Sequence, residues 1–176
     1  DGAETSADAR AAVVFGPTPR EIARSPIFWK LVIAFVAMGL TFYAISINIV
    51  YILTRTASMP VQQIATVQAI GGAAVLLGRL GFGYLLDKLH APLVAVLAIA
   101  MTAAGTLLYA NATATMPIIL AALLIGASVG GESDLMPYLA GRYFGTRSLS
   151  TVFGWFLAAF FVGGAIGPSL FAGFAD

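Results

Sequence analysis

Five long apolar runs constrain this chain more than any other feature of its sequence. They cover residues 27–53, 64–86, 92–110, 116–138 and 152–174. A helix needs roughly 20 apolar residues to cross a hydrocarbon core about 30 Å thick, and each run is close to or above that length. Inside lipid, every backbone polar group must be satisfied within the segment, so such runs are helices and not strands. The sequence therefore predicts an all-α integral membrane protein with five transmembrane helices.

The composition supports a lipid bilayer as the main partner of the chain. Hydrophobic residues make up 60% of the 176 positions and charged residues 10%, whereas soluble domains are about one quarter charged. The alternative, in which the five runs are buried inside a large soluble protein, fails because little polar sequence remains to cover them. The net charge of +1 gives no reason to expect a nucleic-acid partner. The absence of cysteine excludes disulfides and cysteine-based metal or redox chemistry.

The basic residues orient the helices. Short connectors make neighbouring runs antiparallel, and if the segment before residue 27 is cytoplasmic, only Arg55 lies toward the opposite side. Eight basic residues then lie at or toward the cytoplasm: Arg10, Arg20, Arg24, Lys30, Arg79, Lys88, Arg142 and Arg147. This is the excess that the positive-inside rule describes. We expect residues 1–24 to be a cytoplasmic linker and 25–176 a transmembrane domain that ends at Asp176 on the outer face.

The linker contains a start signal for a helix. Thr18 is followed by Pro19 and, three positions after the threonine, by Glu21. Thr with Glu three residues later is a capping box, and Pro suits the first position of a helix. The sequence therefore predicts a short surface helix just before the first membrane span.

Gly83, Asp87 and Lys88 form a motif at the cytoplasmic end of the second run. Here the chain resembles the Major Facilitator Superfamily, whose signature after the second helix of each half runs Gly-x-x-x-Asp-Arg/Lys-x-Gly-Arg/Lys-Arg/Lys. The chain departs from it at 90–92, which is typical of the weaker copy in carboxy-terminal halves. The resemblance implies helices seven to eleven of twelve, with an amino-terminal half and a twelfth helix of the same transporter missing. In the family, this Asp faces the start of a helix in the other half and helps to lock one conformation.

Arg79, Glu132 and Asp134 are the ionisable residues that lie inside the predicted spans at a shared depth. An ionisable side chain within the membrane is costly and is a functional hypothesis by default. Glu132 and Asp134 are two positions apart, which places them about 200° apart around a helix. We therefore expect one carboxyl to pack against a neighbouring helix and the other to meet the transport pathway. Either one is a candidate for proton coupling, and an ion pair with Arg79 is the structural alternative.

Arg79 is the candidate anion clamp, because its planar guanidinium can hold a carboxylate with two hydrogen bonds and does not lose its charge. The chain here resembles the monocarboxylate and oxalate branches of the superfamily, in which an Arg at this place is implicated in anion binding. It departs from them at Val75, where animal monocarboxylate carriers have Asp. It also has no Lys or Arg after Arg147, although oxalate carriers have a Lys in the eleventh helix. One intramembrane cation favours a single carboxylate.

Further substrate-binding candidates are Gln68, Asn48 and Tyr43. Gln68 shares a helix face with Arg79. From Gln68 the positions Gly72, Val75 and Arg79 follow at intervals of four, three and four residues, which is helical spacing. Asn48 and Tyr43 are polar residues of the first run. Ordinary hydrogen bonding between helices is the alternative for each of them.

The predicted function is secondary active transport by alternating access. The cargo is a small organic anion, a monocarboxylate, moved by proton symport or anion exchange across a bacterial inner (plasma) membrane. The sequence has no phosphate loop, metal-ligand cluster or nucleophile triad, so we expect no enzyme activity, no metal and no cofactor. A non-transporting scaffold or receptor on the same fold, or a carrier of another small solute, remains the alternative. This piece alone is not expected to transport, because the cavity forms between two halves.

Overall fold

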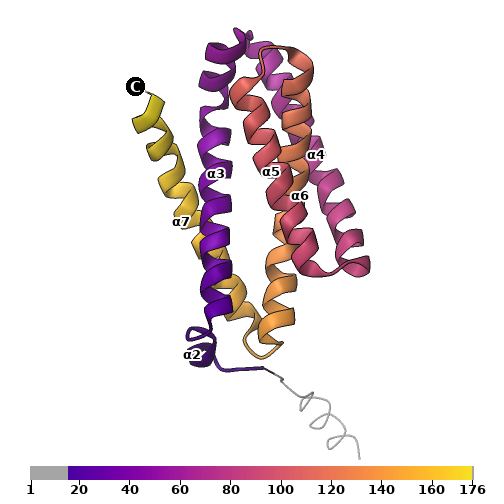
Figure 1. Cartoon of the computed structure of the whole chain (residues 1–176), viewed down its shortest axis with the longest axis vertical. Coiled ribbons are helices and arrows are strands. Elements are labelled where there is room, and N and C mark those ends of the chain that lie inside the picture. Colours follow the sequence, from indigo (N-terminus) through magenta and orange to yellow (C-terminus); the bar gives the residue numbers. More distant parts are fainter. Residues whose placement is uncertain (1–15, 176) are drawn as a thin grey trace, which may run out of the picture.

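The computed structural model describes residues 16–175, which form six helices without a strand. The helices, labelled in Figure 1, are α2 (Pro19–Ile22), α3 (Pro26–Ala57), α4 (Val61–Lys88), α5 (Ala91–Asn111), α6 (Thr115–Phe144) and α7 (Leu149–Ala175). The last five are long and apolar enough to cross a membrane. The predicted all-α architecture with five membrane-spanning helices is confirmed. Arg10 and Asp176, on which the predicted orientation partly rests, lie outside the described residues.

Each membrane helix extends beyond the apolar run that predicted it. α3 begins at Pro26, where proline occupies the first turn and loses no helical hydrogen bond, and it ends before Ser58, which has a φ of 51°. α6 continues through Pro137 to Phe144, six residues past the end of its run. Membrane helices tolerate an internal proline, because neighbouring groups satisfy the freed carbonyl. Hydropathy locates the spans, and each long helix extends past its apolar run at both ends.

The short connections make consecutive long helices antiparallel (Figure 1). The α4–α5 and α6–α7 connections lie toward the end of the bundle that carries α2, and the α3–α4 and α5–α6 connections lie toward the other end. Lys88 is in the last turn of α4 and Arg142 in the last turn of α6, both toward the α2 end, whereas Arg55 is in the last turn of α3. Within the described residues, the bundle therefore has one end richer in basic side chains.

Glycines bring two pairs of helices into backbone contact. A Cβ atom on Gly39 of α3 would overlap the Phe160 carbonyl of α7, and one on Gly78 of α4 would overlap the backbone of Ala127 of α6. Small residues at such positions let membrane helices approach closely, and van der Waals packing drives their association. The pairs α3·α7 and α4·α6 are the most extensively packed pairs of the bundle. The second pair holds the two helices that carry the candidate site.

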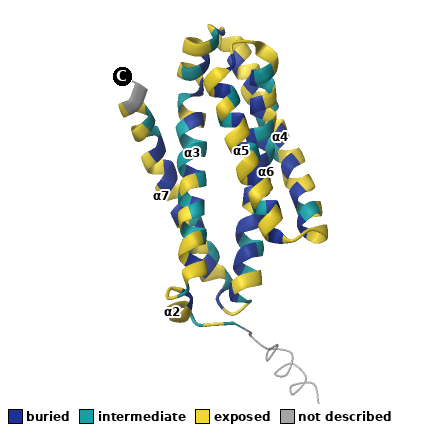
Figure 2. Ribbon diagram, viewed as in Figure 1, coloured by how far each residue is buried: buried dark blue, intermediate teal, exposed yellow. Residues whose placement is uncertain are grey.

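Buried residues follow the faces along which the helices meet, and exposed residues cover the outer faces (Figure 2). Many exposed side chains are large and apolar, including Leu76, Leu77 and Leu80 of α4. Such a surface suits contact with lipid or with another membrane helix and not with water. The buried faces therefore fix the bundle, and the outer faces are available for a membrane environment.

The segment before α3 is fastened to the loop between α6 and α7. The Ser148 hydroxyl donates a hydrogen bond of 2.9 Å to the Pro17 carbonyl, and Ile22 is 1% exposed. The predicted short helix is present as α2. The Glu21 carboxylate accepts hydrogen bonds from the Thr18 backbone N–H at 2.7 Å and from the Thr18 hydroxyl at 2.8 Å. This part of the predicted linker is therefore tied to the helical bundle.

Candidate functional site

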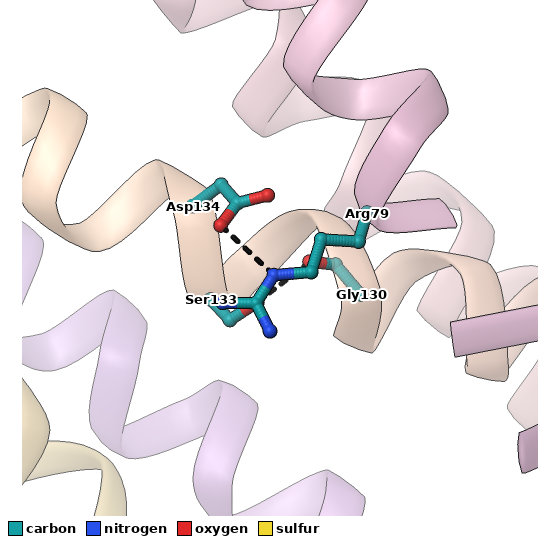
Figure 3. Close-up of polar contacts among 4 residues, drawn as sticks. All are labelled: Arg79, Gly130, Ser133 and Asp134. Atoms are coloured by element: carbon teal, nitrogen blue, oxygen red, sulfur yellow. Dashed lines mark hydrogen bonds and ion pairs between the residues drawn. The ribbon is translucent and has the colours of Figure 1, made fainter. Parts of the chain in front are cut away.

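An ion pair joins α4 to α6 at the candidate site. Nε of Arg79 lies 3.2 Å from Oδ1 of Asp134, and the two side chains are 60% and 32% exposed. Figure 3 shows the two terminal nitrogens of the guanidinium directed away from the Asp134 carboxylate. A second carboxylate could therefore approach the free edge of the guanidinium. The arrangement combines a cation that is held in place with donors that remain accessible.

Glycine at position 130 allows this geometry. A Cβ atom there would overlap the Val75 carbonyl and lie 2.7 Å from the Arg79 backbone nitrogen. The Ser133 hydroxyl, which lies beside the ion pair in Figure 3, donates to the Gly130 carbonyl at 2.7 Å. Because Gly130 lets the backbones of α4 and α6 touch, the Arg79 side chain is long enough to reach Asp134. Asp134 lies one helical turn after Gly130 on α6.

Glu132 lies on a different face of α6 from Asp134. It is 3% exposed and belongs to a buried polar cluster between α5 and α6. The Ser128 hydroxyl lies 3.0 Å from Oε1 of Glu132, 2.9 Å from the Ala98 carbonyl and 2.6 Å from the Thr102 hydroxyl. Among the described residues, Oε2 of Glu132 has no hydrogen-bond partner. Two hydroxyl protons cannot satisfy all of these contacts at once, and a proton on the carboxyl group would supply the missing donor.

Gln68 lines a cavity of about 250 Å³ between α3, α4, α5 and α6, together with Ser46 of α3 and Tyr109 of α5. Gly72 and Val75, which share its face of α4, line the same cavity. Gln68, Gly72 and Val75 thus lead along one face of α4 toward Arg79. A larger cavity of about 470 Å³ between α3 and α5 has no charged lining residue and does not include Arg79 or Asp134.

Asn48 and Tyr43 do not join Arg79 in the structure. The Asn48 side-chain amide donates to the Ala44 carbonyl of its own helix at 2.9 Å. The Tyr43 ring packs at the contact of α3 with α7, with its centroid 5.9 Å from that of Phe160. Substrate contact by either residue stays a prediction. In the structure, Asn48 forms a hydrogen bond within α3, and Tyr43 packs between α3 and α7.

The motif residues occupy the last two turns of α4. Gly83 is half-buried, and Asp87 and Lys88 are exposed. Nζ of Lys88 lies 5.9 Å from the centroid of the Tyr84 ring, and within residues 16–175 Asp87 forms no ion pair. The conformational role of the motif stays a prediction, because it requires a helix from another part of a transporter.

Ser128 and Thr102 belong to the Glu132 cluster, and neither was predicted from the sequence. Ser128 precedes Glu132 by four residues, so helical spacing could have placed the two on one face. Thr102 lies on another helix, and no pattern along the chain connects it to Glu132. In the described part of the chain, no group of three or more His, Cys, Asp or Glu side chains is placed to hold a metal ion.

Comparison with known proteins gives one match. The family model described as Major Facilitator Superfamily matches residues 3–168. Searches of curated proteins and of solved structures found no significant match. The family match covers nearly the whole chain and includes all the site residues discussed above.

Proposed function

Since the chain belongs to the Major Facilitator Superfamily of membrane transporters, we propose that it forms part of a secondary transporter for a small organic anion. The observation that carries the proposal is Arg79, which is 60% exposed inside a membrane span while Asp134 holds it through Nε alone. An isolated cation in this setting is costly unless it has a counter-ion. A carboxylate on the free edge of the guanidinium would be that counter-ion during transport.

Asp134 is the proposed coupling residue. Without substrate, its carboxylate neutralises Arg79 across the α4–α6 contact. A proton that binds to Asp134 removes this negative charge, and a substrate carboxylate then takes its place beside Arg79. One proton and one monocarboxylate would move together by this scheme. If Asp134 instead keeps its proton throughout the cycle, Arg79 has no counter-ion without substrate, and one anion can leave only when another replaces it, which corresponds to exchange.

Glu132 is the second candidate for coupling, because Oε2 is buried without a partner among the described residues. It lies between α5 and α6 with Ser128 and Thr102, away from the ion pair. We assign Asp134 the direct role, since Asp134 alone of the two carboxylates contacts the proposed anion clamp. Glu132 would act through the packing of α6.

The proposed transporter is completed by an amino-terminal half and a twelfth helix. Gly83, Asp87 and Lys88 lie at the exposed end of α4, where a helix of the other half could meet Asp87. The concentration of basic residues at the α2 end supports a cytoplasmic position for the linker. We place the carrier in a bacterial inner membrane, with alternating access through movement of the two halves.

The proposal is tested by substrate binding and uptake with the complete carrier in proteoliposomes. Arg79→Gln should weaken the binding of a radiolabelled monocarboxylate at least about tenfold, because a hydrogen bond to a charged group contributes about 1.5–3 kcal/mol. Arg142→Gln changes an exposed Arg in the last turn of α6, away from the ion pair, and should leave affinity unchanged. Equal affinity of Arg79→Gln and the unmodified carrier would refute the clamp. Binding without any uptake would favour a receptor or scaffold.

A further inference from the structure

We propose that the cavity of about 250 Å³ between α3, α4, α5 and α6 holds the apolar body of the transported anion. The substrate class is then a monocarboxylate with a bulky hydrophobic group, such as an aryl-substituted acid, and not an anion as small as acetate. This inference rests on the proposed function, because Arg79 supplies the contact with the carboxylate.

On α4 and α6, residues that line the cavity share a helix face with residues at the ion pair. On α4, Val75 lines the cavity, and Arg79 follows four residues later on the same face. On α6, Gly126 lines the cavity, and Gly130 lies four residues later against the backbone of Arg79. Four residues correspond to a rise of about 6 Å. A molecule whose carboxylate binds Arg79 could therefore place its other end inside the cavity.

The lining determines what that end can be. Most of the wall is apolar, with Phe42, Ile45 and Ile125 among its residues, and the polar side chains include Gln68 and Ser46. None of the lining residues is charged, so a second carboxylate would lose its hydration without gaining a counter-ion. The volume corresponds to roughly eight groups of the size of a water molecule, at about 30 Å³ each. A single carboxylate with an aromatic or branched body fits these conditions.

Gly72 controls the space in the cavity. It lines the cavity wall, and a Cβ atom built on it meets no other atom within 4 Å. The neighbouring Gly126 differs, because a Cβ atom there would overlap the Gly71 carbonyl. A larger side chain at position 72 therefore fills the cavity without disturbing the contact between α4 and α6. Gly81 of the same helix is exposed, is equally open and does not line the cavity, which makes it a matched control.

The test compares binding of phenylacetate and acetate to the complete carrier and to its Gly72→Leu, Gly81→Leu and Arg79→Gln variants. The unmodified carrier should prefer phenylacetate. Gly72→Leu should weaken phenylacetate binding about tenfold and leave acetate binding within about twofold, since a few methylene groups decide the fit of such a site. Gly81→Leu should change neither, and retained acetate binding shows that the two glycine variants are folded.

Two results separate this inference from the function on which it rests. If Gly72→Leu binds phenylacetate like the unmodified carrier while Arg79→Gln binds neither acid, the cavity does not hold the substrate body and the anion clamp stands. If Arg79→Gln binds both acids normally, the clamp is wrong and the cavity loses its carboxylate contact. A carrier that does not discriminate phenylacetate from acetate would also overturn the inference.

Discussion

Nε of Arg79 lies 3.2 Å from Oδ1 of Asp134, although the two residues are 55 positions apart in the chain. The contact joins two helices whose backbones touch at Gly130. It neutralises a charge within the membrane and still leaves most of the Arg79 side chain exposed. The proposed clamp and the proposed proton coupling both depend on this one contact.

The close approach of α4 and α6 should depend on Gly78. A Cβ atom there would overlap the backbone of Ala127, so Gly78→Val should lower the free energy of unfolding by about 1–3 kcal/mol. Gly81→Val, three residues away and open to its surroundings, should be neutral or slightly stabilising, because valine favours the helix more than glycine does. Unfolding of the detergent-solubilised carrier measures both values. Equal effects of the two variants would mean that this backbone contact does not hold the pair.

The cluster around Glu132 should accept an amide in place of the carboxyl. Gln has the same shape and supplies N–H donors to a site that is short of protons, so Glu132→Gln should keep the unfolding free energy within about 1 kcal/mol. Glu132→Ala leaves a cavity and unsatisfied hydroxyl groups, and should lower the free energy of unfolding by about 2 kcal/mol or more. Thermal unfolding in detergent compares the two variants. A loss with Gln as large as that with Ala would show that the cluster needs a charged carboxylate.

The cap of α2 should weaken in acid. The hydrogen bond from the Thr18 backbone, followed by that from its hydroxyl, lowers the pKa of Glu21 from its ordinary value of 4.5. The cap is therefore fully formed above the ordinary pKa and is lost as the pH falls through the lowered pKa. As the pH falls through that range, hydrogen exchange at the Thr18 amide should become faster relative to exchange at the same amide in Glu21→Gln. An amide whose exchange relative to this variant does not change with pH would contradict the contact.

Hydropathy and helical periodicity predicted much of this structure. The apolar runs located all five long helices, because segments of this length have no other way to satisfy their backbone in lipid. The spacing of Glu132 and Asp134 indicated that the two carboxyls lie on different sides of α6, since two residues correspond to about 200° of rotation. Both inferences use information contained within a single helix.

Contacts between helices could not be predicted in the same way. Whether Arg79 pairs with Glu132 or with Asp134 could not be decided from the sequence, because the rotation of α6 against α4 depends on where Gly78 and Gly130 let the backbones touch. The partnership of Thr102 with Ser128 depends on the rotation of α5, and the bond from Ser148 to Pro17 joins residues 131 positions apart. Periodicity describes each helix alone and does not fix how neighbouring helices are rotated against one another.

The most direct test of the account is the affinity of the complete carrier for a monocarboxylate, compared between the unmodified protein and Asp134→Asn at neutral pH. If Asp134 competes with the substrate for Arg79, removing its charge should tighten binding about 1.5- to 5-fold, because exposed ion pairs contribute about 0.2–1 kcal/mol. An isothermal titration with phenylacetate measures this change. Unchanged or weaker binding by Asp134→Asn would contradict the competition between Asp134 and the transported anion for Arg79.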